Sequence, residues 1–191
     1  MSGKKDPALL KRIAILPGAP EYAQPMEELT GIVYGIDPRD DDKCLNADHY
    51  RHHLAVFPEG QFVAVDTETN QVVGLTLGMR TNRGPHNPMI AQWWDVIGQG
   101  WFTTHEPHGE WMYGVESAVH PDYRGAGVGS RLMDARFAVL KRLNLRGMIA
   151  GSAIIDYPKV ADQMSPEAYL RDVVAGKRFD TNLSKQLHKG F

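Results

Sequence analysis

Trp111-Met-Tyr-Gly-Val-Glu-Ser-Ala-Val-His-Pro-Asp-Tyr-Arg-Gly-Ala-Gly-Val-Gly129 is the most informative stretch of this 191-residue chain. Its first half is rich in aromatic and β-branched residues, which is typical of a strand. Beyond it, apolar residues recur at helical spacing, at Val128, Leu132, Ala135, Val139 and Leu143. The sequence therefore predicts a strand, a glycine loop and a helix. Met148 to Ile155 predicts a second strand parallel to the first.

The three glycines of this loop favour an anion-binding site. Gly125, Gly127 and Gly129 lie where the chain enters the helix, so a ligand can approach bare backbone amides. The first N–H groups of a helix and its dipole both attract negative charge, and Arg124 adds a cation. The spacing Gly-x-Gly-x-Gly differs from Gly-x-Gly-x-x-Gly, and no Gly-Lys-Ser/Thr follows, which excludes two common phosphate loops. The alternative is a glycine turn that only packs the helix on a sheet.

The stretch Val119-His-Pro-Asp-Tyr-Arg-Gly-Ala-Gly-Val-Gly129 resembles the acetyl-CoA-binding motif of the GNAT superfamily of N-acetyltransferases, whose core is Arg/Gln-x-x-Gly-x-Gly/Ala. Arg124, Gly127 and Gly129 fill that core. The resemblance covers about residues 60 to 155. It implies an α/β (α+β) fold with a mixed, mostly antiparallel sheet flanked by helices and a parallel strand pair around the glycine loop.

The resemblance also implies acetyl-CoA (CoA) as the cofactor and assigns residues to it. In this family the loop amides hold the CoA pyrophosphate, and the end of the preceding strand pairs with the pantetheine arm. Carried over to this sequence, the cofactor-binding residues are Ser117, Ala118, Val119, Arg124, Gly125, Ala126, Gly127, Val128, Gly129 and Ser130.

Acetyl transfer to an amine by direct attack on a thioester requires a base, an oxyanion site and a proton for the leaving thiolate. Glu116 is our candidate base, because it is the lone carboxylate of an apolar strand; its alternative role is a strand-edge or buried ion pair. The N–H groups of Ser117 and Ala118 are candidates for the oxyanion site. Gln186 stands where the family often has a tyrosine, so Tyr157 is our candidate proton donor.

Two further residues were weighed for this chemistry. Tyr113 stands behind Tyr157 as a proton donor, and both tyrosines have packing as their alternative role. Cys44, the only cysteine, lies in a polar segment far from the motif and is a poor nucleophile candidate. Direct attack by the amine needs no nucleophilic side chain.

Composition narrows the class of protein. The 21 Lys and Arg against 23 Asp and Glu give a net charge of −2, so we expect no nucleic-acid partner and no anionic membrane surface. No apolar run approaches the ~18 residues of a membrane span, and the first seven residues carry no apolar signal region. We expect a cytoplasmic protein acting on a small-molecule or peptide amine; a homodimer is compatible with the sequence.

Two other features carry open alternatives. The segment between Arg80 and Glu110 is too long for a plain connection, and it either shapes the acceptor pocket or forms an apolar cluster that pins the loop. His49 and His53 have the i, i+4 spacing of a metal pair, but no third ligand is evident, so we predict no metal.

We expect residues 1–191 to form a single acetyltransferase domain. Compared with the family, residues Asp156 to Thr181 are an insertion, and we expect the domain to lack the last two strands of the family fold. The Tyr157-Pro-Lys segment is similar to a GNAT subgroup sometimes joined to carbon-nitrogen hydrolase domains. The leading function is an N-acetyltransferase. The alternatives are a non-catalytic CoA-binding or sensing domain of a larger protein and, more weakly, a dinucleotide-binding oxidoreductase.

Overall fold

Strand β4, Trp111–Val119, lies next to the last strand of a five-stranded sheet whose order follows the sequence, β1 to β5. The computed structural model describes residues 7–40, 44–88 and 91–191, so the first six residues, part of the segment considered for a signal region, lie outside the described residues. The other strands are β1 Ile13–Pro17, β2 Phe62–Asp66, β3 Gln71–Thr81 and β5 Gly147–Ala150. Neighbouring strands from β1 to β4 are antiparallel, whereas β4 and β5 are parallel.

The helices arise where the sequence places caps and helical spacing. Asn46 caps α3 by accepting from the N–H groups of Asp48 and His49, and Ser165 caps α6 through the N–H of Ala168. The helices are α1 Pro7–Lys11, α2 Ala23–Tyr34, α3 Ala47–Val56, α4 Trp93–Val96, α5 Val128–Arg142, α6 Pro166–Val174 and α7 Leu183–His188. Single 3-10 turns lie at Pro20–Tyr22, Pro58–Gly60, Pro121–Tyr123 and Tyr157–Lys159.

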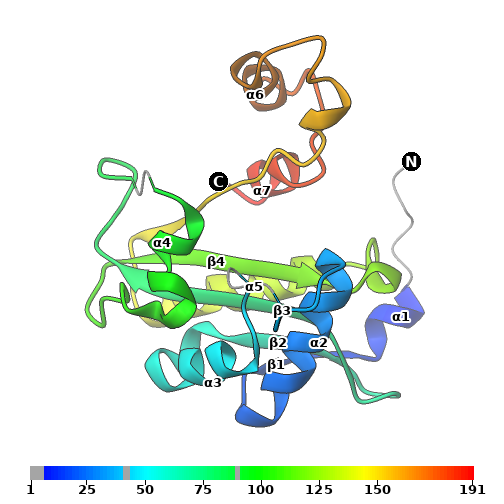
Figure 1. Cartoon of the computed structure of the whole chain (residues 1–191), viewed down its shortest axis with the longest axis vertical. Helices are drawn as coiled ribbons and strands as arrows, with labels where there is room; N and C mark the ends of the chain where they lie inside the picture. The colour runs from blue at the N-terminus through cyan, green and yellow to red at the C-terminus, as the bar shows by residue number, and fades with distance from the viewer. Residues whose placement is uncertain (1–6, 41–43, 89–90) are drawn as a thin grey trace. The chain divides into compact units, whose positions relative to one another are not determined.

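The described chain divides into two compact units, residues 1–149 and residues 150–191. In the first unit, α2 and α3 cover one face of the sheet and α5 the other (Figure 1). The alternation of strand side chains separates the two cores: on β2, Val63 and Val65 belong to the core beneath α2, whereas Ala64 between them belongs to the core beneath α5. The mixed, mostly antiparallel sheet with one parallel pair confirms the predicted fold.

The pairing of β3 with β4 is interrupted once. Leu77 lies opposite Glu116 and Gly78 opposite Gly114, so Val115 is an extra residue on β4 and forms a β-bulge. Glu116, the predicted base, therefore lies directly beside the only register shift in that strand pair.

The second unit is organised around one buried carboxylate. Asp180 accepts from the N–H of Asp156 and the hydroxyl of Tyr169, and also from the N–H groups of Asn182 and Leu183 at the start of α7. Its side chain thereby joins the turn after residue 155, α6 and α7. The prediction that the chain is a single domain lacking two family strands stays a prediction.

Among the described residues, no helix is both long and apolar enough to cross a membrane.

Candidate active site

The residues just before the glycine loop hold it against the sheet. The hydroxyl of Tyr123 donates to Asp66 Oδ2 at 2.7 Å, and Arg12 pairs with the same oxygen at 2.9 Å. These two bonds hold the pKa of Asp66 below its usual range, although burial alone would raise it. The loop therefore begins from a fixed point on β1 and β2.

The glycine loop has the backbone of an anion cradle. Gly125 and Gly127 have φ of 80° and 102°, which only glycine adopts without strain, and Gly127 caps α5. The first backbone bond into the helix runs from Arg131 N–H to Gly127 O. The N–H groups of the preceding residues, including Gly129, therefore have no acceptor within the helix.

The space above this loop is open. A Cβ atom added to Gly125 would meet no atom within 4 Å, and one added to Gly129 would meet only Val119 Cγ2 at 3.7 Å. Arg124 is exposed beside them and its Nε donates to Val119 O at 3.1 Å. Open glycine surfaces, amides at a helix start and a neighbouring guanidinium fit a diphosphate.

The strand that leads to the loop has an open edge. The pairing of β4 with β5 begins at the hydrogen bond from Arg146 N–H to Glu110 O, just before both strands. Because β5 has four residues and β4 has nine, β5 ends before it reaches the part of β4 near Ser117. His120 N–H bonds Val73 O, and the alternation of an antiparallel ladder then turns the N–H of Ala118 toward β3 and that of Ser117 toward the open edge. The N–H of Ser117 therefore faces the open edge and that of Ala118 faces β3, and the assignment of both as oxyanion donors stays a prediction.

Glu116 lies on the α2 face of the sheet. The hydroxyl of Tyr34, the last residue of α2, donates to Glu116 Oε1 at 3.0 Å. The second carboxylate oxygen, Oε2, is buried and has no hydrogen-bond partner. Burial raises the pKa of Glu116 to about 7, while the bond from Tyr34 and the charge of Arg136 act in the opposite direction. A carboxylate that titrates near neutral pH suits proton transfer.

Arg136 of α5 holds the bulge from the other side of the sheet. Its Nη2 donates to the backbone oxygens of Leu77 and Glu116, and the hydroxyl of Thr76 also donates to Glu116 O at 3.2 Å. The side chain of Arg136 is buried, and burial lowers its pKa to about 9. The Glu116 carboxylate therefore accepts a hydrogen bond from Tyr34, whereas the guanidinium of Arg136 donates to backbone carbonyl groups.

The other side chains considered for the chemistry have the following contacts. Tyr157 belongs to the second unit, where its hydroxyl donates to Met164 O at 3.1 Å and its ring meets Tyr169 edge-on. Tyr113 is buried in the core on the α2 face. Cys44 is also buried, with its Sγ 3.8 Å from Leu45 O. The assignment of Tyr157 as proton donor stays a prediction.

The long segment after Arg80 packs into the main core. Phe102 is buried there and stacks on His53 at a centroid distance of 3.6 Å, while His53 Nε2 donates to Gly100 O at 2.6 Å. His49 accepts from Asn46 N–H as part of the α3 cap. In the described residues no three His, Cys, Asp or Glu side chains gather as a metal site.

The same segment also reaches the bulge. The indole of Trp93 donates to Val115 O at 2.9 Å, next to Glu116. The apolar residues of the segment thus belong to the main core and not to a satellite cluster, α4 lies beside the candidate base, and a role in shaping the acceptor pocket stays a prediction.

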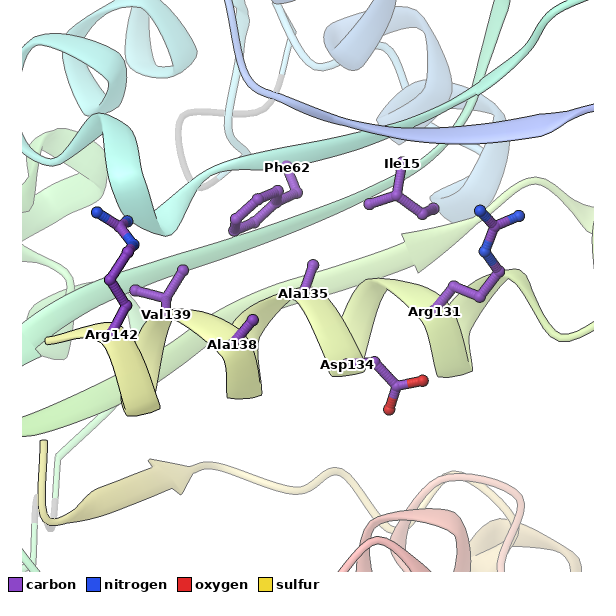
Figure 2. Close-up of a pocket in the computed structure, with 8 residues that line it drawn as sticks. All are labelled: Ile15, Phe62, Arg131, Asp134, Ala135, Ala138, Val139 and Arg142. Atoms are coloured by element: carbon purple, nitrogen blue, oxygen red, sulfur yellow. The ribbon is translucent and has the colours of Figure 1, made fainter. Parts of the chain in front are cut away.

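An open groove runs along the other face of the sheet, between α5 and strands β1 and β2. Figure 2 shows Ile15 and Phe62 on one side and Arg131 and Arg142 near the two ends of the helix. The groove contains neither Glu116 nor any residue of the glycine loop. It is separate from the candidate site.

Sequence reasoning missed Tyr34, Arg136 and Trp93. Tyr34 and Trp93 come from segments that precede β4 in the chain, and their spacing to the strand follows no motif. The only signal was a buried cation in the otherwise apolar core stripe of α5, where Arg136 follows Leu132 at i+4.

These features define a protein of mixed α+β fold in which an open glycine loop between a strand and a helix lies on the same strand as a buried carboxylate. A model of the acetyltransferase (GNAT) family matches residues 34–154. The chain belongs to this family, which confirms the resemblance drawn from the motif.

Two relatives from Bacillus subtilis (strain 168) are similar in sequence. The probable hydrolase YhcX is 33% identical over 173 residues, which cover 84% of this chain and 33% of YhcX. The uncharacterized N-acetyltransferase YkwB is 30% identical over 143 residues, which cover 75% of this chain and 62% of YkwB. The chain thus spans less than two thirds of either relative.

Solved structures show the same fold at low identity. The GphF GNAT-like decarboxylase in complex with isobutyryl-CoA has a TM-score of 0.74 and 21% identity, covering 93% of this chain and 85% of its own. The acetyltransferase yncA from Salmonella typhimurium with acetyl-CoA has a TM-score of 0.51 and 13% identity, covering 79% and 75%.

Proposed function

We propose that this chain is an acetyl-CoA-dependent N-acetyltransferase that transfers an acetyl group to an amine by direct attack on the thioester. The observation that carries the proposal is the arrangement on β4. An open glycine loop at one end of β4 suits a diphosphate, and a buried carboxylate with an unpartnered oxygen lies on the same strand. The family membership and the CoA complexes of structures with this fold support acetyl-CoA as the acyl donor.

The cofactor would be held by the residues that the motif assigns. The amides of the loop from Gly125 to Ser130, with Arg124, would bind the diphosphate, and the open edge at Ser117 would pair with the pantetheine arm. Acetyl-CoA supplies an acyl group activated as a thioester. Within the proposal, the N–H of Ser117 stabilises negative charge on the thioester oxygen.

Glu116 would accept the proton of the acceptor. A lysine-like amine with a pKa near 10.4 is mostly protonated at pH 7, and presenting it neutral costs about 4.6 kcal/mol. A carboxylate with a pKa of about 7 can share that cost, because it binds the proton in the pH range where the reaction runs. The proton for the thiolate would come from Tyr157, as proposed from the sequence.

Two measurements test the proposed function. Calorimetry should show acetyl-CoA binding, and a thiol assay should show CoA release with at least some members of a panel of small-molecule and peptide amines. Binding without CoA release over the whole panel would support the alternative, a non-catalytic CoA-binding or sensing domain. Preference for NAD over CoA would contradict both.

A second candidate reaction is decarboxylation of a carboxylated acyl-CoA. Glu116 is partly protonated near pH 7, so it could deliver a proton to the carbon that loses CO₂. The GphF decarboxylase shares this fold, but its 21% identity shows the fold alone. Incubation with malonyl-CoA and no amine separates the two reactions. Release of CO₂ would favour the decarboxylase, and its absence together with amine-dependent CoA release would favour the transferase.

A further inference from the structure

Tyr34 joins helix α2 to the candidate base. It is the last residue of α2, after which Gly35 ends the helix with φ of 68°. The residue as a whole is 53% exposed, yet its hydroxyl reaches inward to Glu116 Oε1 at 3.0 Å. An exposed aromatic ring with an inward hydroxyl adds little to the core. The bond to Glu116 is therefore the clearest reason for this conformation.

The two carboxylate oxygens of Glu116 have different surroundings. Oε1 accepts from Tyr34, while Oε2 is buried without a partner. An ionised carboxylate oxygen that is shielded from water is costly unless a donor reaches it. The chain supplies a donor to one oxygen, which leaves the other for a donor from outside the protein, such as an amine N–H.

We propose that Tyr34 is the positioning residue of Glu116: it fixes Oε1 from the α2 side and so presents Oε2 to the N–H of the acceptor amine. This proposal rests on the proposed function and assigns a role to a residue that the motif does not include.

The groups around this pair determine how it titrates. The bond from Tyr34 lowers the pKa of Glu116, and the charge of Arg136 from α5 acts in the same direction. Burial raises the pKa of Tyr34 above its usual range, so its hydroxyl stays a donor through neutral pH. Burial and then the charge of Glu116 raise the pKa of Tyr50 in α3, and Cys44 before that helix acts on Tyr34 through its charge.

The decisive variant is Tyr34→Phe, which keeps the ring and removes only the donor. Without the bond, the pKa of Glu116 should rise by roughly one unit, since one unit corresponds to the loss of a single charge-assisted bond of modest strength. The acid limb of the pH–rate profile should move up by the same amount. Activity should fall by about five-fold at pH 7 and recover by pH 9, because the ionised fraction recovers there.

Tyr22→Phe is the matched control. Tyr22 lies in the turn before α2 and packs against the same core, and the substitution is chemically identical. It should leave the profile unchanged. Thermal unfolding and acetyl-CoA affinity of Tyr34→Phe should match the wild type, which shows that the fold and the cofactor site are intact.

A double variant separates positioning from a structural effect. In a Glu116→Gln background, Tyr34→Phe should cause no further change in the profile, because the group that it tunes is gone. Additive losses would overturn the proposal, and so would an unshifted midpoint in the single variant.

Titration of the Glu116 carboxyl by NMR gives a readout without activity. A raised midpoint in Tyr34→Phe supports the positioning role even if no amine is acetylated, whereas an unchanged midpoint overturns it. Failure of the proposed function would instead appear as inactivity of the wild type over the amine panel.

Discussion

Glu116 combines a functional benefit with a cost to stability. Its pKa lies at about 7 in the folded protein, against 4.5 for an ordinary glutamate. A group whose pKa is raised on folding contributes stability below the unfolded value, and that contribution is lost as the pH rises through the folded value. The stability that the protonated carboxyl contributes below pH 4.5 is therefore lost between pH 4.5 and about pH 7, and the loss stays constant at higher pH.

Glu116→Gln should accordingly separate activity from stability. We expect turnover to fall by about 10²-fold, with acetyl-CoA affinity unchanged, because a base contributes only to the chemical step. Above pH 8 the variant should be more stable than the wild type by on the order of 1–3 kcal/mol. Denaturant unfolding at pH 5 and pH 9 measures the difference. Glu110→Gln, an exposed carboxylate before the same strand, should change neither quantity; a wild-type pH–rate profile in Glu116→Gln would remove the assignment.

Protonation of His53 should lower the free energy of unfolding as the pH falls. Burial lowers its pKa to about 3, and its Nδ1 is buried without a partner. A histidine with a lowered folded pKa contributes stability above the unfolded value of 6.5, and this is lost as the pH falls toward 3. We expect His53→Gln to flatten the fall in unfolding free energy over that range by up to about 1.4 kcal/mol per pH unit. His86→Gln, an exposed histidine, should leave the slope as it is. An unchanged slope in His53→Gln would show that this ring is charged in the folded state.

In the strand–loop–helix unit, a glycine substitution tests cofactor binding most clearly where the new side chain adds bulk without straining the backbone. Gly127 has φ of 102°, so any side chain there strains the backbone as well as filling space. Gly129 lies in the first turn of α5, where an added Cβ would make only an ordinary contact with Val119. Gly129 is therefore the cleaner position.

Gly129→Ala should keep the fold and weaken cofactor binding. Alanine in a helix is preferred over glycine by up to about 1 kcal/mol, so the melting temperature should hold or rise. Acetyl-CoA affinity should fall by at least roughly ten-fold if the diphosphate lies against the loop amides, since the new methyl group occupies its approach. Calorimetry and thermal unfolding on one sample measure both effects. Unchanged affinity would show that the cofactor does not use this surface.

At the scale of the whole molecule, the division into two units has a measurable consequence. Asp180 is buried in the second unit and accepts bonds from four groups, which hold its pKa below the usual range despite burial. Its contribution to stability is present above the unfolded pKa of 3.8 and is lost as the pH falls below it.

Asp180→Ala should loosen residues 150–191 more than residues 1–149. We expect limited proteolysis to cleave the second unit first, because its turn, α6 and α7 lose their common acceptor at a cost of about 1–3 kcal/mol. The cleavage pattern and the acetyl-CoA affinity of Asp180→Ala measure the effect, each compared with that of the control variant Asp172→Ala. Equal protection of both units would contradict the division.

A feature of this protein could be predicted from the sequence when the residues that form it are neighbours in the chain. The strand, the glycine loop and α5 were predicted because their pattern is contiguous and of regular period. The caps Asn46 and Ser165 are equally local, because each accepts from N–H groups only two or three residues further on. The bond between Tyr34 and Glu116 joins residues 82 positions apart, and no spacing rule connects them.

The sequence by itself determined the family, the glycine loop between strand and helix and the presence of one carboxylate in an apolar strand, because these are properties of neighbouring residues. Only the tertiary structure decided which oxygen of Glu116 is bonded, that Arg136 holds the bulge, and that Ser117 rather than Ala118 faces the open edge. These features depend on strand register and on helix packing, through which long-range contacts set the solvation of each group.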